Sequence, residues 1–106
     1  MKLLFTITAI LSLTISSVNA NEGKALYECT KKIAKYYGIS SEAANIPVPS
    51  YSNTDNNEFF YSWPKGNFNL VVLGKTVPLS ASCNGILSPL KLQYVSVNGK
   101  EVYNSY

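Results

Sequence analysis

The sequence contains six carboxylates and no histidine, so proton transfer near neutral pH would have to rely on aspartate and glutamate. Pairs of such carboxylates hydrolyse glycosidic bonds. Among the six, only Glu58 is surrounded by aromatic residues that could line a sugar site. One interpretation is therefore a small carbohydrate-binding protein or hydrolase of the cell envelope that uses Glu58 with Trp63 and Tyr61.

Nucleophilic catalysis has less support. The two cysteines lose their thiol chemistry if they are paired, and without histidine a serine would need a lysine as its base. Ser80 and Ser82 lie near Lys75, but any lysine-bearing strand offers such an arrangement. We therefore expect a non-enzymatic protein without a cofactor.

One polar segment has the spacing of metal ligands. Asn53, Asp55 and Asn57 alternate as the first oxygen ligands of a calcium loop do. However, Glu58 stands where such a loop needs glycine, and Pro64 stands where it needs its last carboxylate. An ordinary hairpin turn without a metal is the better interpretation.

The first twenty residues have the form of a secretory signal peptide. Lys2 is followed by an apolar run and then by small residues up to Ala20, and the run is too short to span a bilayer. We therefore predict an exported protein, periplasmic or secreted, whose mature part is a single domain of residues 21–106. In an oxidising compartment its two cysteines can form one intramolecular disulfide, Cys29 to Cys83.

The segment from Lys24 to Tyr37 has the periodicity of an amphipathic helix, ended by Gly38. The apolar positions on its inner side are Leu26, Cys29, Ile33 and Tyr37. Its outer side carries lysines, including Lys31, Lys32 and Lys35. These lysines are compatible with contact to a membrane surface, as in a cationic membrane-active factor, although such a face is more often only solvated.

The remainder of the chain is predicted to form β-strands. In residues 77–83 the residues Val77, Leu79, Ala81 and Cys83 share one face. Strands are also expected at 58–63, 68–72, 90–94 and 101–103, with turns at 64–67 and 84–89, and Asn98-Gly99 closes the last hairpin. The tail from Asn104 to Tyr106 should fray. The expected fold is α+β, with one N-terminal amphipathic helix packed on a four- to five-stranded antiparallel sheet and tied to it by one disulfide.

A binding surface is suggested by the eight tyrosines, because tyrosine gives a large contact area at small entropic cost. The candidate residues that would contact a partner are Tyr51, Asn53, Asp55, Phe60 and Trp63. Trp63 has an equally good alternative as a core residue under the helix. The leading functional hypothesis is an exported protein-binding domain of inhibitor, immunity or accessory type. Nucleic-acid binding is disfavoured, because arginine is absent and the lysines are not interleaved with the aromatics.

Cys29 lies in a lysine-rich predicted helix, and the predicted sheet contains Asn69 to Val72, Gly74-Lys75 and the cysteine-bearing segment 80–85. On these residues the arrangement resembles that of small bacterial envelope proteins of the YebF and colicin M immunity protein type, in which a helix bears one cysteine and an antiparallel sheet the other. The final Asn98-Gly99 hairpin departs from that pattern. The resemblance implies a periplasmic or secreted protein that acts through protein contact, and it assigns no functional residue.

Overall fold

The computed structural model describes residues 21–106, and the predicted signal peptide at residues 1–20 lies outside them. The described chain begins in a helix, residues 21–36, which we call the N-terminal helix. A one-turn helix and five strands follow. Their bounds are α2 Ser41–Ala44, β1 Tyr51–Asn53, β2 Glu58–Val72, β3 Lys75–Ile86, β4 Lys91–Val97 and β5 Lys100–Asn104.

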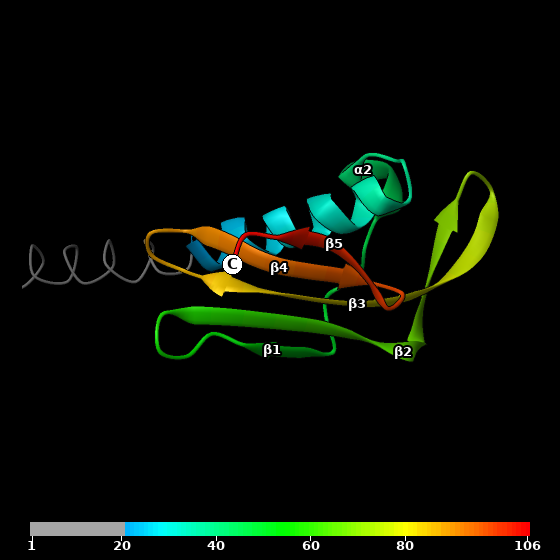
Figure 1. Ribbon diagram of the computed structural model, residues 1–106. Coiled ribbons are helices and arrows are strands. Elements are labelled where there is room, and N and C mark those ends of the chain that lie inside the picture. Colours follow the sequence, from blue (N-terminus) through cyan, green and yellow to red (C-terminus); the bar gives the residue numbers. More distant parts are fainter. Residues whose placement is uncertain (1–20) are drawn as a thin grey trace, which may run out of the picture.

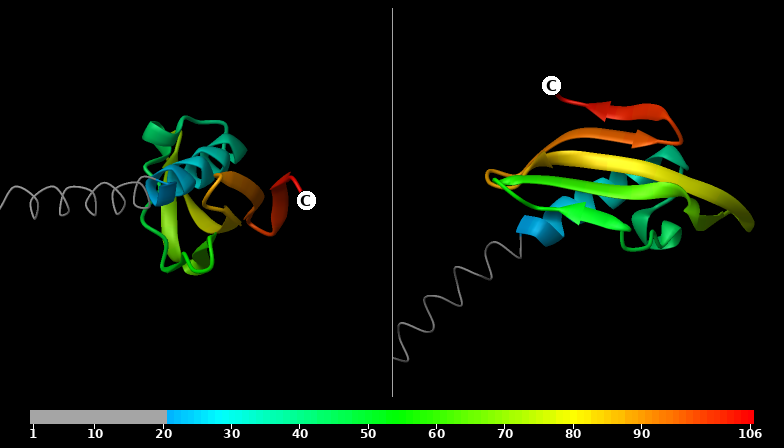
Figure 2. Two further views of the ribbon diagram at one scale, coloured as in Figure 1. Left: turned by 90° about the vertical axis from the view of Figure 1, so that its left-hand side faces the viewer. Right: turned by 90° about the horizontal axis from the view of Figure 1, so that it is seen from below.

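The five strands form one antiparallel sheet in the order of the sequence, β1-β2-β3-β4-β5. The N-terminal helix crosses one face of this sheet, and within residues 21–106 no helix covers the other face (Figures 1 and 2). This arrangement confirms the predicted fold class. The sheet has five strands, because the strands expected at 58–63 and 68–72 form the single strand β2 and Tyr51–Asn53 adds a short edge strand that the sequence pattern did not reveal.

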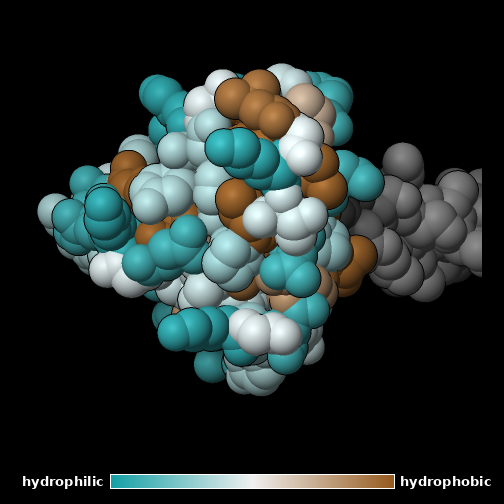
Figure 3. All heavy atoms as spheres, turned by 90° about the vertical axis from the view of Figure 1, so that its right-hand side faces the viewer, coloured by the Kyte–Doolittle hydropathy of each residue, from teal (hydrophilic) through white to brown (hydrophobic). Residues whose placement is uncertain are grey.

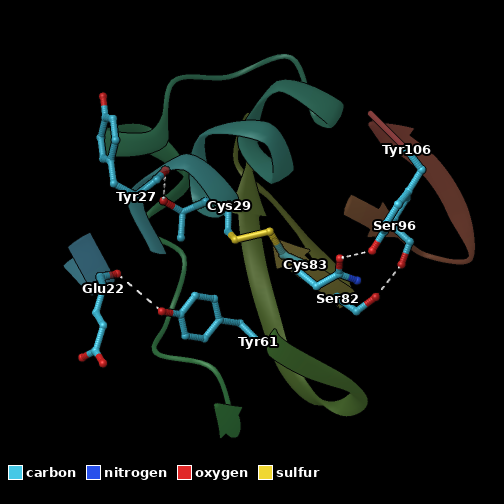
Figure 4. The surroundings of a disulfide bond; sticks show 10 residues. Glu22, Tyr27, Cys29, Tyr61, Ser82, Cys83, Ser96 and Tyr106 are labelled. Carbon is cyan, nitrogen blue, oxygen red and sulfur yellow. Dashed lines mark hydrogen bonds between the residues drawn. A yellow bond between two sulfur atoms is a disulfide. The ribbon is translucent and has the colours of Figure 1, made fainter. Parts of the chain in front are cut away.

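The core lies between the helix and the covered face of the sheet. Cys29 and Ile33 of the helix are fully buried against Trp63, Leu79 and Val95 of three neighbouring strands. Cys29 and Cys83 form the predicted disulfide, with Cα atoms 5.9 Å apart (Figure 4). The bond closes a loop of 54 residues, which in the chain-entropy account stabilises a small fold by about 4 kcal/mol.

The helix ends as its sequence predicts. Gly38 has a φ of +75°, and the Ile39 amide donates to the carbonyl of Ala34, so the last turn closes on a left-handed glycine. The next turn, α2, is capped by Ser40, whose hydroxyl accepts a 3.1 Å hydrogen bond from the Ala43 amide. The proline-containing segment 46–49 that follows forms no strand and serves as a tether into the sheet.

The predicted turn at residues 64–67 is wrong, because it lies inside a strand, and the predicted turn at 84–89 begins too early, because the observed turn covers residues 87–90. Residues 64–67 form a bulge in β2, where the pairing with β3 shifts between Trp63 and Phe68 and then resumes. Asn84-Gly85 lies within β3, which continues to Ile86. Turn-forming residues therefore displace the ladder locally at these positions without reversing the chain.

The face prediction for β4 is wrong at Tyr94, and the prediction for the tail is also wrong. Leu90 and Leu92 contact the core as expected, but the pairing with β3 shifts near Gln93, so Tyr94 turns to the uncovered face. The tail does not fray. Asn104 pairs with Tyr94, and the Ser105 amide donates a 2.9 Å hydrogen bond to the Gln93 carbonyl.

Candidate binding face

The uncovered side of the sheet presents two rows of side chains that run across its strands. Residues that pair directly across antiparallel strands point to the same face, so the strand register defines each row. One row consists of Tyr51, Ser62, Ser82 and Ser96, and the other of Asn53, Phe60, Asn84 and Tyr94. We call these eight residues the open face. Aromatic rings lie at both sides of it, and small polar side chains lie between them.

Hydrogen bonds order the middle of the open face. The hydroxyls of Ser82 and Ser96 are 2.8 Å apart across β3 and β4. Tyr106 folds back over the sheet, and its hydroxyl donates to the Asn84 side-chain oxygen at 2.8 Å. Figure 4 shows Ser82, Ser96 and Tyr106 on the side of the sheet away from the disulfide, which confirms the separation of the two faces.

Tyr51 and Phe60 form the aromatic part of the open face at the β1 edge. Their rings meet edge to face with centroids 5.8 Å apart, and both remain exposed. This geometry is a favourable one for an aromatic pair, so each ring holds the other in place. The pair therefore offers a rigid apolar surface to a ligand or a partner protein.

A hollow of about 410 Å³ opens at the loop end of the open face. Carboxylates, amides and aromatic rings line it together, including Asp55, Glu58, Asn53, Phe60, Asn84 and Tyr106. Such a mixture can both stack against a flat apolar group and hydrogen-bond to hydroxyl or amide groups around it.

Asn57 fixes the loop that forms one wall of this hollow. Its side chain donates to the Ser88 carbonyl at 2.7 Å and accepts from the Ser88 amide at 3.0 Å. Its own carbonyl accepts a hydrogen bond from the Leu87 amide. Because Asn56 and Asn57 both have positive φ, a conformation that asparagine tolerates well, the loop is compact and is tied to the β3–β4 connection.

The predicted partner-contacting residues separate into two groups. Tyr51, Asn53 and Phe60 belong to the open face, and Asp55 lines the adjoining hollow. Trp63 is not on this surface: it is fully buried on the helix side, where its indole Nε1 donates a 2.7 Å hydrogen bond to the Pro47 carbonyl. The period of two along β2 places Trp63 opposite to Phe60.

The same alternation separates Glu58 from both of its predicted aromatic partners. Tyr61 and Trp63 are buried in the core, whereas Glu58 is exposed on the other side of β2. The aromatic residues that line the hollow together with Glu58 are Phe59, Phe60 and Tyr106. A sugar site built from Glu58, Tyr61 and Trp63 is therefore excluded by the fold.

Asn53, Asp55 and Asn57 do not form one ligand loop. Asn53 lies in β1 and pairs with Phe60. The Asp55 carboxylate accepts a hydrogen bond from the neighbouring Asn56 amide, and the Asp55 carbonyl accepts one from the Glu58 amide. These three residues are thus part of a tight hairpin connection, as the preferred interpretation expected.

The lysines of the N-terminal helix do not all face solvent. Lys31 and Lys35 are exposed, but Lys32 is half-buried, with its ammonium group 4.7 Å from the ring centroid of Tyr103 on β5. This cation–π contact couples the helix to the edge of the sheet. The free cationic surface is therefore smaller than the sequence suggests.

Two tyrosines have perturbed hydroxyl groups, and neither belongs to the open face. Burial raises the pKa of Tyr61, with a further upward contribution from the negative charge of Glu22. Burial also raises the pKa of Tyr37, although a hydrogen bond from Asn98 opposes the shift. Both hydroxyls are bonded within the fold, Tyr61 to the Glu22 carbonyl and Tyr37 to the Pro78 carbonyl, so they stabilise structure.

Comparison of the chain with models of protein families, with curated proteins and with solved structures found no significant match. The resemblance to the YebF and colicin M immunity protein type therefore stays a prediction. Across residues 21–106, no helix has the length and apolar character needed to cross a membrane. The disulfide is compatible with the predicted export.

Proposed function

We propose that the protein is an exported, non-enzymatic binding domain that contacts a partner protein through its open face. The observation that carries this proposal is the exposed pair Tyr51 and Phe60 beside the ordered polar row of Ser82 and Ser96. Rigid aromatic anchors surrounded by small polar groups are the composition that protein interfaces favour. Inhibitor, immunity and accessory roles all require such a surface and no catalytic group.

The covalent architecture supports the same proposal. Cys83 points into the core from β3, and its neighbours Ser82 and Asn84 point to the open face. The disulfide to the helix therefore holds the middle strand of the binding surface in place. A surface that is ordered before binding loses less entropy when a partner docks.

The test is site-specific photocrosslinking in the envelope fraction of the source organism. A photoreactive residue at Phe60 is expected to capture a protein, and excess unlabelled wild-type protein should compete for that capture. The Tyr51→Ser variant should compete poorly, because it lacks one of the two aromatic anchors. The Tyr27→Ser variant is the matched control, since Tyr27 lies on the helix and is 51% exposed, against 52% for Tyr51.

Two outcomes would contradict this assignment. The first is that a photoreactive residue at Tyr27 captures the same protein with equal yield. The second is that Tyr51→Ser competes as well as the wild type does. Either result would show that the open face is not the specific docking surface.

The hollow beside the open face favours a second candidate, carbohydrate binding. Glu58 and Asp55 offer hydrogen-bond acceptors, Asn53 and Asn84 offer amides, and the Phe60 ring can stack on a sugar face. Replacing Glu58 with glutamine distinguishes the candidates. Loss of glycan binding in Glu58→Gln, with partner capture unchanged, would support the sugar site, and an unchanged glycan profile would exclude it.

A further inference from the structure

The hairpin of β2 and β3 extends past the rest of the molecule. Beyond the bulge at residues 64–67, its strands continue as an arm, residues 68–79, that projects past the N-terminal helix and the other strands (Figures 1 and 2). The base of the arm is held by the buried side chains of Leu70 and Leu79. Its tip is the two-residue turn Leu73-Gly74.

The turn at the tip contains Leu73 in a backbone conformation that is unfavourable for leucine. Leu73 and Gly74 have φ angles of 51° and 80°, and Asn98 and Gly99 in the β4–β5 turn have almost the same values, 52° and 80°. Asparagine is favoured at the first position of such a turn, whereas an L-residue with a larger side chain is strained there. The two hairpin turns thus have the same backbone conformation, with asparagine at the first position of one turn and leucine at the first position of the other.

The leucine has no packing role that would explain its presence. Leu73 is 88% exposed, and Val71 beside it is 63% exposed. Val72 points to the opposite side of the hairpin, where it is partly buried and packs against the core. The exposed apolar side chains of the tip are therefore Val71 on its outer face and Leu73 at its apex. Figure 3, which views the molecule from this end, shows hydrophobic residues between hydrophilic ones.

The charges near the tip all have one sign. Lys75 directly follows the turn and Lys65 lies at the base of the arm, and both are exposed. The sequence has no carboxylate between Glu58 and Glu101. An apolar tip with lysines behind it matches the two layers of an anionic bilayer, hydrocarbon inside and negative headgroups outside.

We propose that the arm docks the protein on an anionic lipid surface, with Leu73 and Val71 entering the interface and Lys75 and Lys65 contacting headgroups. Positive charge without any neighbouring carboxylate in the sequence from 59 to 100 suits an anionic lipid surface as the occupant of this apolar tip. Two small side chains and two charges give weak, reversible binding that requires anionic lipid. This proposal is independent of the function proposed for the open face.

The first test compares Leu73→Asn with the wild type in a vesicle co-sedimentation assay. The vesicles contain equal parts of phosphatidylcholine and phosphatidylglycerol, with pure phosphatidylcholine as the reference. Leu73→Asn should lower the partition coefficient by about tenfold or more, the factor that follows from exposing a leucine side chain to water. The same substitution should raise Tm by roughly 4–8 °C, because asparagine relieves the strained turn.

Opposite effects on binding and on stability separate docking from misfolding. The matched control is Val48→Asn, which removes another exposed apolar side chain, 77% exposed, from the proline-containing tether. It should leave vesicle binding unchanged. If Leu73→Asn binds the vesicles as tightly as the wild type does, the proposal is overturned.

The second test concerns the charges. The double variant Lys65→Gln/Lys75→Gln should lose about fivefold in partitioning for each lysine removed. The double variant Lys31→Gln/Lys35→Gln removes the same charge from the N-terminal helix and should bind normally. If the helix pair has the larger effect, the docking surface is the helix and the arm proposal fails.

A depth measurement completes the design. A Leu73→Trp variant should be quenched by brominated lipid, whereas the wild type, whose single tryptophan Trp63 is fully buried, should not be quenched. Absence of quenching at the tip would contradict insertion. Self-association that Leu73→Asn abolishes in the absence of vesicles would also overturn the proposal, by assigning the tip to a second copy of the chain.

Discussion

The indole Nε1 of Trp63 donates a 2.7 Å hydrogen bond to the carbonyl oxygen of Pro47. Through this bond the largest buried side chain of the sheet holds the segment that connects α2 to β1. The bond also satisfies the one polar atom that Trp63 would otherwise bury without a partner. Trp63 is thus a structural residue of the core and contributes nothing to the open face directly.

Replacing Trp63 with phenylalanine should destabilise the protein by about 2–4 kcal/mol. The substitution leaves a cavity in the core and removes the hydrogen bond to Pro47. Urea unfolding followed by circular dichroism measures the change. Phe60→Leu, at the neighbouring exposed position, is the control and should change the free energy of unfolding by less than about 1 kcal/mol. Equal losses in the two variants would contradict the assignment of Trp63 to the core.

Removing the disulfide should cost about 2–5 kcal/mol. The variant Cys29→Ala/Cys83→Ala keeps two small apolar residues in the core but releases the 54-residue loop in the unfolded chain. Unfolding of this variant, compared with the oxidised wild type in the same buffer, gives the difference. The reduced wild type serves as a second reference and should resemble the variant. Unchanged stability would show that the link does not constrain the unfolded chain.

Gly85 should not tolerate any side chain. A Cβ atom at this position would collide with the carbonyl oxygen of Lys91 and would lie 2.7 Å from carbons of the Phe59 ring. Gly85→Ala should therefore destabilise the fold by about 1–3 kcal/mol. Gly23→Ala is the opposite case, because Gly23 is helical with nothing within 4 Å of its added Cβ, and it should stabilise by up to about 1 kcal/mol. In thermal unfolding, Gly85→Ala should have a lower Tm than the wild type, and Gly23→Ala should have a higher one.

The helix, the disulfide and the last hairpin could be predicted from the sequence, because each depends on local chemistry. A spacing of three and four residues defines the buried face that contains Cys29 and Ile33. Alternation along β3 puts Cys83 on the core side. The Asn98-Gly99 pair specifies its turn without help from the remainder of the fold.

The bulges limited the prediction of the remaining strands. A single displaced residue reverses the faces of everything beyond it, and no local pattern marks where this happens. The shift near Gln93 moved Tyr94 to the open face, and the bulge at residues 64–67 allowed β2 to continue through a proline and a glycine. In both strands the pairing with neighbouring strands determined which face each side chain occupies, and the local sequence pattern does not specify that pairing.

Only some residues of the candidate site could be predicted from the sequence, for the same reason. Tyr51, Asn53 and Phe60 follow from their position in an aromatic and polar stretch. Ser82 and Asn84 could have been added, because they alternate with Cys83 along one strand. Tyr106 could not have been predicted, because its position depends on how the tail folds back. In the folded protein the Tyr106 hydroxyl reaches the Asn84 side chain.

Stability should decrease at alkaline pH, and Tyr61 should account for part of the decrease. Burial raises the pKa of Tyr61 above its ordinary value of 10.0, so the folded state keeps this proton at a pH where the unfolded chain releases it. The stabilisation is complete below pH 10.0 and is lost as the pH rises through the pKa of the folded state. Tyr61→Phe should flatten this part of the profile, as measured by urea unfolding at a series of pH values. If Tyr61→Phe loses stability at alkaline pH as steeply as the wild type does, burial of Tyr61 does not account for the decrease.

Tyr106 should control the order of the tail with little effect on global stability. Its hydroxyl donates to Asn84, its amide donates to the Asn104 side chain, and the Ser105 hydroxyl donates to the Leu92 carbonyl. Because hydrogen bonds at exposed sites contribute about 0.5–1.5 kcal/mol each, deleting Tyr106 should lower the unfolding free energy by no more than about 1.5 kcal/mol. Hydrogen exchange at the Ser105 amide should nevertheless accelerate, because fraying of a chain end requires only local opening. Tyr106→Phe removes the bond to Asn84 alone and should accelerate that exchange less than the deletion does, whereas equal protection in the deletion variant and the wild type would show that the tail is held by β5 pairing without its last residue.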